Sequence, residues 1–176
     1  ADNDIGAVCA ALMRTGFSVQ VVRDADFLTL QQRLADFADA AAEASSVIIY
    51  YAGHGFEYSG QNFIVPVGAP IRTSRNDIDL QYVSLDSLVQ QVVPDTAFGL
   101  LFIDACRTPD PIVTLLDPDP RAADGVVSTV GLLTIKQGAV LYSTARGRPA
   151  FDDAPVGSPT SPFAAALTRS IATPGI

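Results

Sequence analysis

Apolar residues recur at helical spacing in four segments of the chain. Ile5, Val8 and Leu12 fall on one face of the first segment. The second segment carries a similar apolar stripe, and the acidic pair Asp24 and Asp26 just before it is expected to form a turn and a helix cap. The pattern predicts helices over residues 4–15, 27–44, 85–93 and 163–171.

Short runs of almost unbroken apolar residues lie between these segments. Runs such as Val47-Ile48-Ile49 are typical of strands that are buried on both faces in a parallel sheet. Because helices alternate with such runs, we predict an α/β fold with a mostly parallel central sheet flanked by helices on both faces. The predicted strands cover residues 17–22, 46–51, 62–67, 98–104 and 138–142.

Three segments are predicted to be loops, and no strand precedes the first helix. Residues 68–84 are polar, whereas 107–130 and 146–162 are too long to be simple connectors. A doubly wound sheet usually begins with a strand. We therefore expect residues 1–176 to form one domain that is a fragment of a longer polypeptide and lacks the first strand of its fold.

Composition narrows the functional classes. The net charge of −8 argues against a nucleic-acid surface, which needs a basic footprint. No apolar run reaches the roughly 20 residues of a membrane span. With two cysteines and one histidine, a Cys/His zinc cluster is not expected, and Cys9 is expected in the core. A reducing, cytoplasmic compartment is the default expectation, and nothing in the sequence assigns a localisation.

The single histidine follows a predicted strand, in the stretch "YYAGHG" (residues 50–55). A lone histidine at such a place is most often an ordinary loop residue. The glycines on either side suggest instead that they clear space, so that the backbone and the imidazole of His54 can both face a ligand. In that case Gly55 can offer its N–H to a developing oxyanion.

A second strand delivers a cysteine in the same way. In "LLFIDACRT" (residues 100–108), a buried strand is followed at once by Cys106. Taken alone, such a cysteine is most often part of the core. Ligands of open α/β sheets gather at the carboxyl ends of the strands, so neighbouring strands would bring His54 and Cys106 to one edge. That pair is the minimal cysteine nucleophile with its acid/base, and the Cys106 N–H can serve as a second oxyanion donor.

"YYAGHG" followed by "IDACR" resembles the caspase-like cysteine peptidases of the caspase–metacaspase clan, and most closely the bacterial branch called orthocaspases. "NFIVPVGA", "GAVLYSTARG" and "SPFAAALTRSI" extend the resemblance over nearly the whole chain. It implies a caspase-like fold, with Cys106 as nucleophile and His54 as general acid/base. "CRT" departs from the "CRG" of caspases and the "CHSG" of many metacaspases.

The resemblance also implies a substrate preference. Caspases carry glutamine two residues before the nucleophile and cleave after aspartate, whereas metacaspase-like enzymes carry aspartate there and cleave after Arg or Lys. This chain has Asp104, and Asp4 would be the second acid of the pocket for the P1 side chain. Ala52 stands where metacaspases often have serine. Asp104 could instead cap the turn after its strand, and Asp4 could equally be a helix N-terminal acid.

Two further features of the family concern processing and calcium. The loop over residues 107–130 lies where the clan has its processing linker, and Arg121 is the best candidate for self-cleavage, with Arg107, Arg146 and Arg148 as weaker ones. Many metacaspases need calcium, but no calcium cluster can be assigned here. The acidic pairs Asp77/Asp79 and Asp152/Asp153 are expected to be solvated, so no metal site and no required cofactor are predicted.

The hypothesis from the sequence is a monomeric endopeptidase that acts on peptides or proteins with a basic P1 residue and binds no nucleic acid. The first alternative is a catalytically silent caspase-like module that binds partners. A flavodoxin-like nucleotide-binding domain is the second, but no phosphate-cradling glycine loop follows an early strand.

Overall fold

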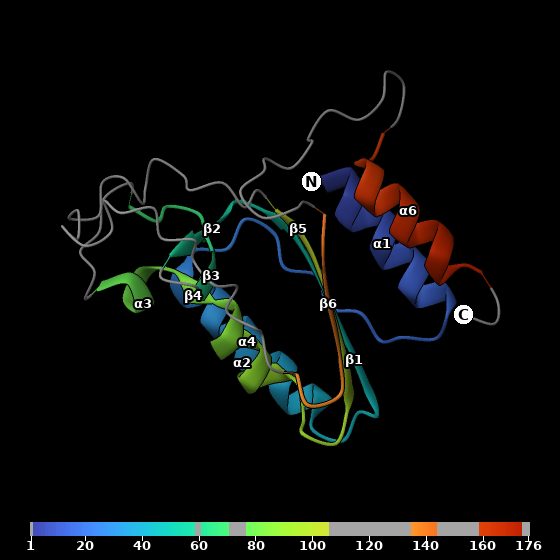
Figure 1. The fold of residues 1–176 in the computed structure, drawn as a ribbon, viewed down its shortest axis with the longest axis horizontal. Coiled ribbons are helices and arrows are strands. Elements are labelled where there is room, and N and C mark those ends of the chain that lie inside the picture. The colour runs from blue at the N-terminus through green and yellow to red at the C-terminus, as the bar shows by residue number, and fades with distance from the viewer. Residues whose placement is uncertain (1, 59–60, 71–76, 106–134, 144–158, 174–176) are drawn as a thin grey trace, which may run out of the picture.

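The computed structural model describes residues 2–58, 61–70, 77–105, 135–143 and 159–173. Figure 1 shows a central sheet with helices on both sides of it and a smaller sheet at one end. The elements in chain order are α1 Asp2–Arg14, α2 Phe27–Ala41, β1 Ser46–Gly53, β2 Gly55–Tyr58, β3 Gln61–Ile64, α3 Ile78–Gln81, β4 Val83–Ser84, α4 Leu85–Val92, β5 Phe98–Ala105, β6 Gly138–Tyr142 and α6 Pro162–Ile171.

The central sheet has the order β1-β5-β6, and all its strands are parallel. β1 and β5 are paired along their whole length, from Ser46 opposite Phe98 to Gly53 opposite Ala105. The predicted α/β class with a parallel sheet is thus confirmed, and the apolar strands 46–51, 98–104 and 138–142 form it. The in-register pairing means that β1 and β5 end side by side.

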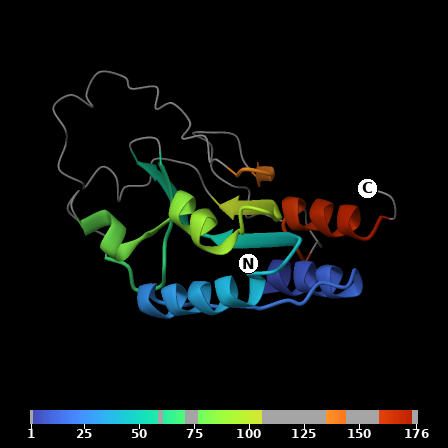
Figure 2. The same ribbon diagram turned by 90° about the horizontal axis from the view of Figure 1, so that it is seen from below.

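Helices cover the two faces of this sheet in pairs. α1 and α6 lie together on one face, and α2 and α4 lie on the other (Figures 1 and 2). Side chains of β1 alternate between the two faces, as expected for a strand. Ile48 and Tyr50 pack in the core under α1 and α6, whereas Ile49 and Tyr51 pack in the core under α2 and α4.

Side-chain oxygens cap three of the helices. Asp26 accepts a hydrogen bond from the Thr29 N–H at the start of α2, as the sequence predicts, and this bond lowers the pKa of Asp26. Ser84 caps α4 and Ser161 caps α6 in the same way. These caps fix where α4 and α6 begin.

A second, antiparallel sheet of order β2-β3-β4 was not predicted. Residues 68–84, expected to be loop, contain α3 and β4, and β2 begins directly after the histidine. β2 and β4 are too short for a periodic pattern to distinguish them from loops, since pairing with β3 is what defines them. The rings of Phe56 in β2 and Phe63 in β3 stack with their centroids 5.2 Å apart, and this contact helps to hold the small sheet together.

The expected strand over residues 17–22 is wrong. This segment has no strand structure, although Phe17 and Val19 pack on the core under α1 and α6. Alternating apolar residues report burial of one side of a segment, but a strand also needs a hydrogen-bonded neighbour. Cys9 of α1 is also less buried than expected and is in contact with Met13. None of the described helices has the length and apolar character of a membrane span.

Candidate active site

His54 lies at the junction between the two sheets. β1 ends at Gly53, β2 begins at Gly55, and the His54 side chain is exposed. Gly53 pairs with Ala105, the last residue of β5, so that His54 and Cys106 each follow one member of a register pair in the sequence. Cys106 itself lies outside the described residues. The condition for bringing His54 and Cys106 together, that their two strands are parallel neighbours, is therefore met, while the contact between the two side chains stays a prediction.

The backbone of His54 is held by two hydrogen bonds to its carbonyl oxygen. The Val65 N–H, just after β3, donates at 3.0 Å, and the Tyr51 hydroxyl donates at 2.6 Å. A carbonyl oxygen has two lone pairs, and these two donors use both. Burial raises the pKa of Tyr51 to about 12, against a smaller opposing contribution from the Val65 N–H, so the phenol stays protonated and can donate.

Gly53 explains how the Tyr51 ring reaches this carbonyl. A Cβ at position 53 would lie 2.7 Å from the Tyr51 hydroxyl oxygen and 2.9 Å from the ring carbon that bears it. The sequence suggested that the glycines clear space for a ligand. The space beside Gly53 is instead filled by the Tyr51 side chain, which folds back over it.

Asp104 lies at the carboxyl end of β5, opposite Ala52 in the register. Its Oδ2 accepts hydrogen bonds from the Tyr50 hydroxyl at 3.2 Å and from the Ser161 hydroxyl at 2.7 Å. Both donors are side chains from other elements, so Asp104 links β1, β5 and the start of α6. The alternative reading, in which Asp104 serves the turn after its own strand, accounts for neither bond.

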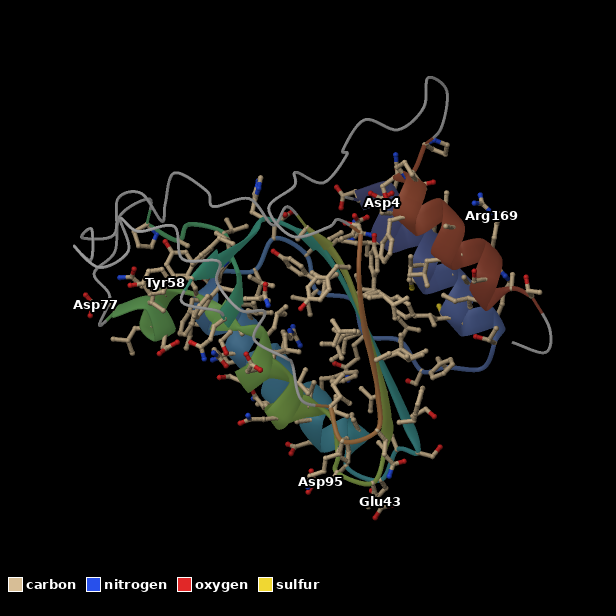
Figure 3. All side chains as sticks on the ribbon, in the orientation of Figure 1. Asp4, Glu43, Tyr58, Asp77, Asp95 and Arg169 are labelled. Carbon is tan, nitrogen blue, oxygen red and sulfur yellow. The ribbon has the colours of Figure 1, made fainter. Side chains whose placement is uncertain are left out.

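Asp4 belongs to the same cluster although it comes from the first helix. It is only 7% exposed, and its Oδ1 accepts a hydrogen bond from the Ser161 backbone N–H at 2.6 Å. Ser161 therefore contacts both carboxylates, one through its hydroxyl and one through its backbone. In Figure 3, Asp4 lies at the end of the sheet opposite Glu43 and Asp95, which precede β1 and β5. Asp4 thus lies at the same end of the sheet as the carboxyl ends of the strands.

The electrostatics of Tyr50 reflect this acidic cluster. Its pKa is raised strongly, first by burial and then by the negative charges of Asp104 and Asp4. A phenol so placed remains a neutral hydrogen-bond donor to Asp104. Together, Asp4, Asp104, Tyr50 and Ser161 form what we call the acidic cluster, which presents two carboxylates at one edge of the sheet.

The sequence did not identify Tyr50, Tyr51 or Ser161 as site residues. The Ser-Pro pair at 161–162 is a recognisable helix start, but nothing in it shows that the serine also binds Asp104 and Asp4. The tyrosines stand inside the quoted motif, and only the fold shows what their hydroxyls contact.

Several sequence candidates fall outside the described residues: Cys106, Arg107, Arg121, Arg146, Arg148, Asp152 and Asp153. Within the part of the chain that the structure describes, no three His, Cys, Asp or Glu side chains gather as a metal site would require. Asp77 stands at the N-cap position of α3 without a side-chain capping bond. The structure therefore adds no calcium ligands to the sequence analysis.

Comparison with known proteins gives one family and two relatives. The family model described as the caspase domain matches residues 1–175. Mucosa-associated lymphoid tissue lymphoma translocation protein 1 from Homo sapiens and its homologue from Mus musculus are each 37% identical to this chain over 60 residues. The matched stretch covers 34% of this chain and only 7% of the length of each relative.

Proposed function

This chain belongs to the caspase-domain family of cysteine peptidases, and on that premise we propose that it is an endopeptidase that cleaves after Arg, and less readily after Lys. Its substrates are proteins or peptides with a basic P1 residue. The motifs "YYAGHG" and "IDACR" favour the orthocaspase branch within the family. We propose that the domain acts as a monomer and needs no cofactor for the chemical step.

In this proposal Cys106 is the nucleophile and His54 the general acid/base. The Cys106 thiolate attacks the scissile carbonyl carbon, and the imidazolium of His54 protonates the leaving amine as the C–N bond breaks. Water, deprotonated by His54, then releases the acyl group from the sulfur. The N–H groups of Gly55 and Cys106 stabilise the oxyanion. The in-register ends of β1 and β5, next to which both residues stand in the sequence, support this assignment.

The observation that carries the substrate preference is the joining of Asp4 and Asp104 through Ser161. The described residues of the acidic cluster contribute two carboxylates that a single residue, Ser161, brings together. Such a site favours a guanidinium, which can bind two carboxylates at once through its fork of N–H donors, over a point-charge ammonium. Ala52, opposite Asp104, offers no hydrogen-bonding side chain, so the carboxylates would provide the selectivity.

The test is the hydrolysis of two fluorogenic peptides that differ only in Arg or Asp at P1. Wild-type protein should cleave only the Arg peptide, and Cys106→Ala should abolish cleavage without loss of folding. Cleavage after Asp would retain the dyad and refute the role of Asp104. Cleavage of neither peptide by the folded protein, with and without calcium, would favour the silent interaction module instead.

Self-processing is a separate part of the proposal. Incubation of the wild-type chain should yield a new N-terminus at Ala122, directly after Arg121, and Cys106→Ala should remain intact. Arg121→Gln should block this cut and leave cleavage of the peptide measurable. A cut at another basic residue would move the processing site without changing the assignment of the nucleophile.

A further inference from the structure

The peptide group between His54 and Gly55 links the proposed acid/base residue to the proposed oxyanion donor. Its carbonyl belongs to His54, and its N–H belongs to Gly55, the proposed oxyanion donor. Because a peptide group is planar, fixing the direction of the C=O also fixes the direction of the N–H. Whatever holds the His54 carbonyl therefore sets where the Gly55 N–H points.

The strand register shows that this N–H is not used within the small sheet. Residue pairs in an antiparallel ladder alternate between those that exchange hydrogen bonds and those that do not. Since the Val65 N–H donates to the His54 carbonyl, Gly55 and its partner Ile64 form a pair that exchanges none. The Gly55 N–H consequently points away from β3.

The second donor to the His54 carbonyl, Tyr51, comes from a different sheet. The Val65 bond is part of the continuing β2–β3 ladder, whereas the Tyr51 hydroxyl reaches the same oxygen from β1 at 2.6 Å. The absence of a side chain at Gly53 is what allows the ring to lie there, because a Cβ would come within 2.7 Å of the hydroxyl. One half-buried side chain thus ties the end of β1 to the start of β2.

We propose that Tyr51 is a positioning residue for catalysis, which acts by orienting the His54–Gly55 peptide group so that the Gly55 N–H faces the oxyanion. The inference rests on the proposed peptidase function. Tyr51 touches neither substrate nor the reacting atoms in this scheme. Gly53 is part of the same arrangement, since its lack of a side chain leaves the space that the Tyr51 ring occupies.

The main test compares two tyrosines that each donate to a backbone carbonyl. Tyr51→Phe should lower kcat about five- to tenfold and leave KM within about twofold, because an oxyanion contact forms in the transition state and not in the bound substrate. Tyr82, which follows α3 and packs against Phe56 of the small sheet, donates its hydroxyl to the Pro70 carbonyl at 2.5 Å and is the matched control. Tyr82→Phe loses the same kind of bond and should keep the wild-type kcat.

A double-mutant cycle tests the role of Gly53. Gly53→Ala should reduce kcat about as much as Tyr51→Phe, because the new methyl group displaces the hydroxyl from the His54 carbonyl. Adding Tyr51→Phe to Gly53→Ala should then cost little more, since both changes remove the same contact. If the kcat losses of the two single variants instead multiply in the double variant, the two residues act independently and the proposed role of Gly53 and Tyr51 is overturned.

A second readout does not depend on activity. With selective labelling of glycine nitrogen, the Gly55 amide resonance should shift in Tyr51→Phe and stay in place in Tyr82→Phe. If the wild type cleaves no peptide, the proposed function fails while this resonance still decides the role of Tyr51. An unshifted resonance together with an unchanged kcat, or equal kcat losses in both variants, would overturn the inference.

Discussion

Tyr50 and Tyr51 are neighbours in the sequence, yet their hydroxyls serve opposite faces of β1. Tyr50 points to the side of α1 and α6, where it donates to the Asp104 carboxylate. Tyr51 points to the side of α2 and α4, where it donates to the His54 carbonyl. The same residue type therefore contacts a charged side chain on one face and a backbone group on the other.

The two faces of β1 therefore support different parts of the proposed site. On the proposed function, the face of Tyr50 holds the carboxylates that bind the P1 cation, and the face of Tyr51 holds the backbone around the acid/base. Changes on the first face should act mainly on KM and on substrate preference. Changes on the second face should act mainly on kcat. The predictions below concern the first face and the stability that both faces share.

The largest effect is expected from Asp104. Asp104→Asn removes one negative charge from the cluster and should lower kcat/KM for an Arg substrate about 100-fold, as for the loss of one partner of a desolvated ion pair. Steady-state kinetics measure this loss. Asp95→Asn is the control, because Asp95 pairs with Lys136 at the opposite end of the sheet (Figure 3). Equal losses in both variants would mean that the effect is not local to the cluster.

Ser161 should have the next largest effect. Ser161→Ala removes the hydroxyl that binds Asp104 and should raise KM for Arg substrates about tenfold, since hydrogen bonds to charged groups are stronger than neutral ones. It also removes a helix cap, worth about 1 kcal/mol of stability. Ser84→Ala removes the cap of α4 at a similar cost and should leave KM unchanged. Ser161→Thr, which retains a hydroxyl, should restore much of the binding.

Tyr50→Phe should have a smaller effect of the same kind. Its hydrogen bond to Asp104 is longer than that of Ser161, at 3.2 Å, so KM should rise about three- to fivefold with kcat unchanged. Set beside Tyr51→Phe, this variant tests the separation of the two faces directly. A fall in kcat for Tyr50→Phe, with KM unchanged, would contradict the separation.

The smallest effect is an alkaline loss of stability that both tyrosines share. Tyr51 has a pKa of about 12 in the folded chain against an ordinary value of 10.0, and that of Tyr50 is also raised. Between these values the unfolded chain has released protons that the folded chain still holds, so the free energy of unfolding decreases as pH rises from 10 toward 12. Urea unfolding below and within this window measures the slope, which either Tyr→Phe variant should flatten. An unchanged slope would contradict the raised pKa values.

Most of the central fold could be predicted because its signals are local. The apolar runs of β1, β5 and β6 and the amphipathic stripes of the main helices each extend over enough residues to show a period. The small antiparallel sheet could not be predicted, since β2 and β4 are short and exist only through pairing with β3. The segment 17–22 shows the converse, because its apolar alternation reflects packing without pairing.

For the site, the sequence by itself determined that two buried strands are each followed by a motif with a chemically reactive residue. It also named the candidates: Asp104 at the end of one strand, and His54 and Cys106 directly after the two strands. Strand ends and glycine-flanked residues are visible in a linear pattern. The resemblance also named Asp4, but only the tertiary structure showed that Ser161, 157 positions further along the chain, joins Asp4 to Asp104, because α1 packs on α6. It also decided what the two tyrosines do, since the alternation of a strand sends adjacent side chains to opposite faces.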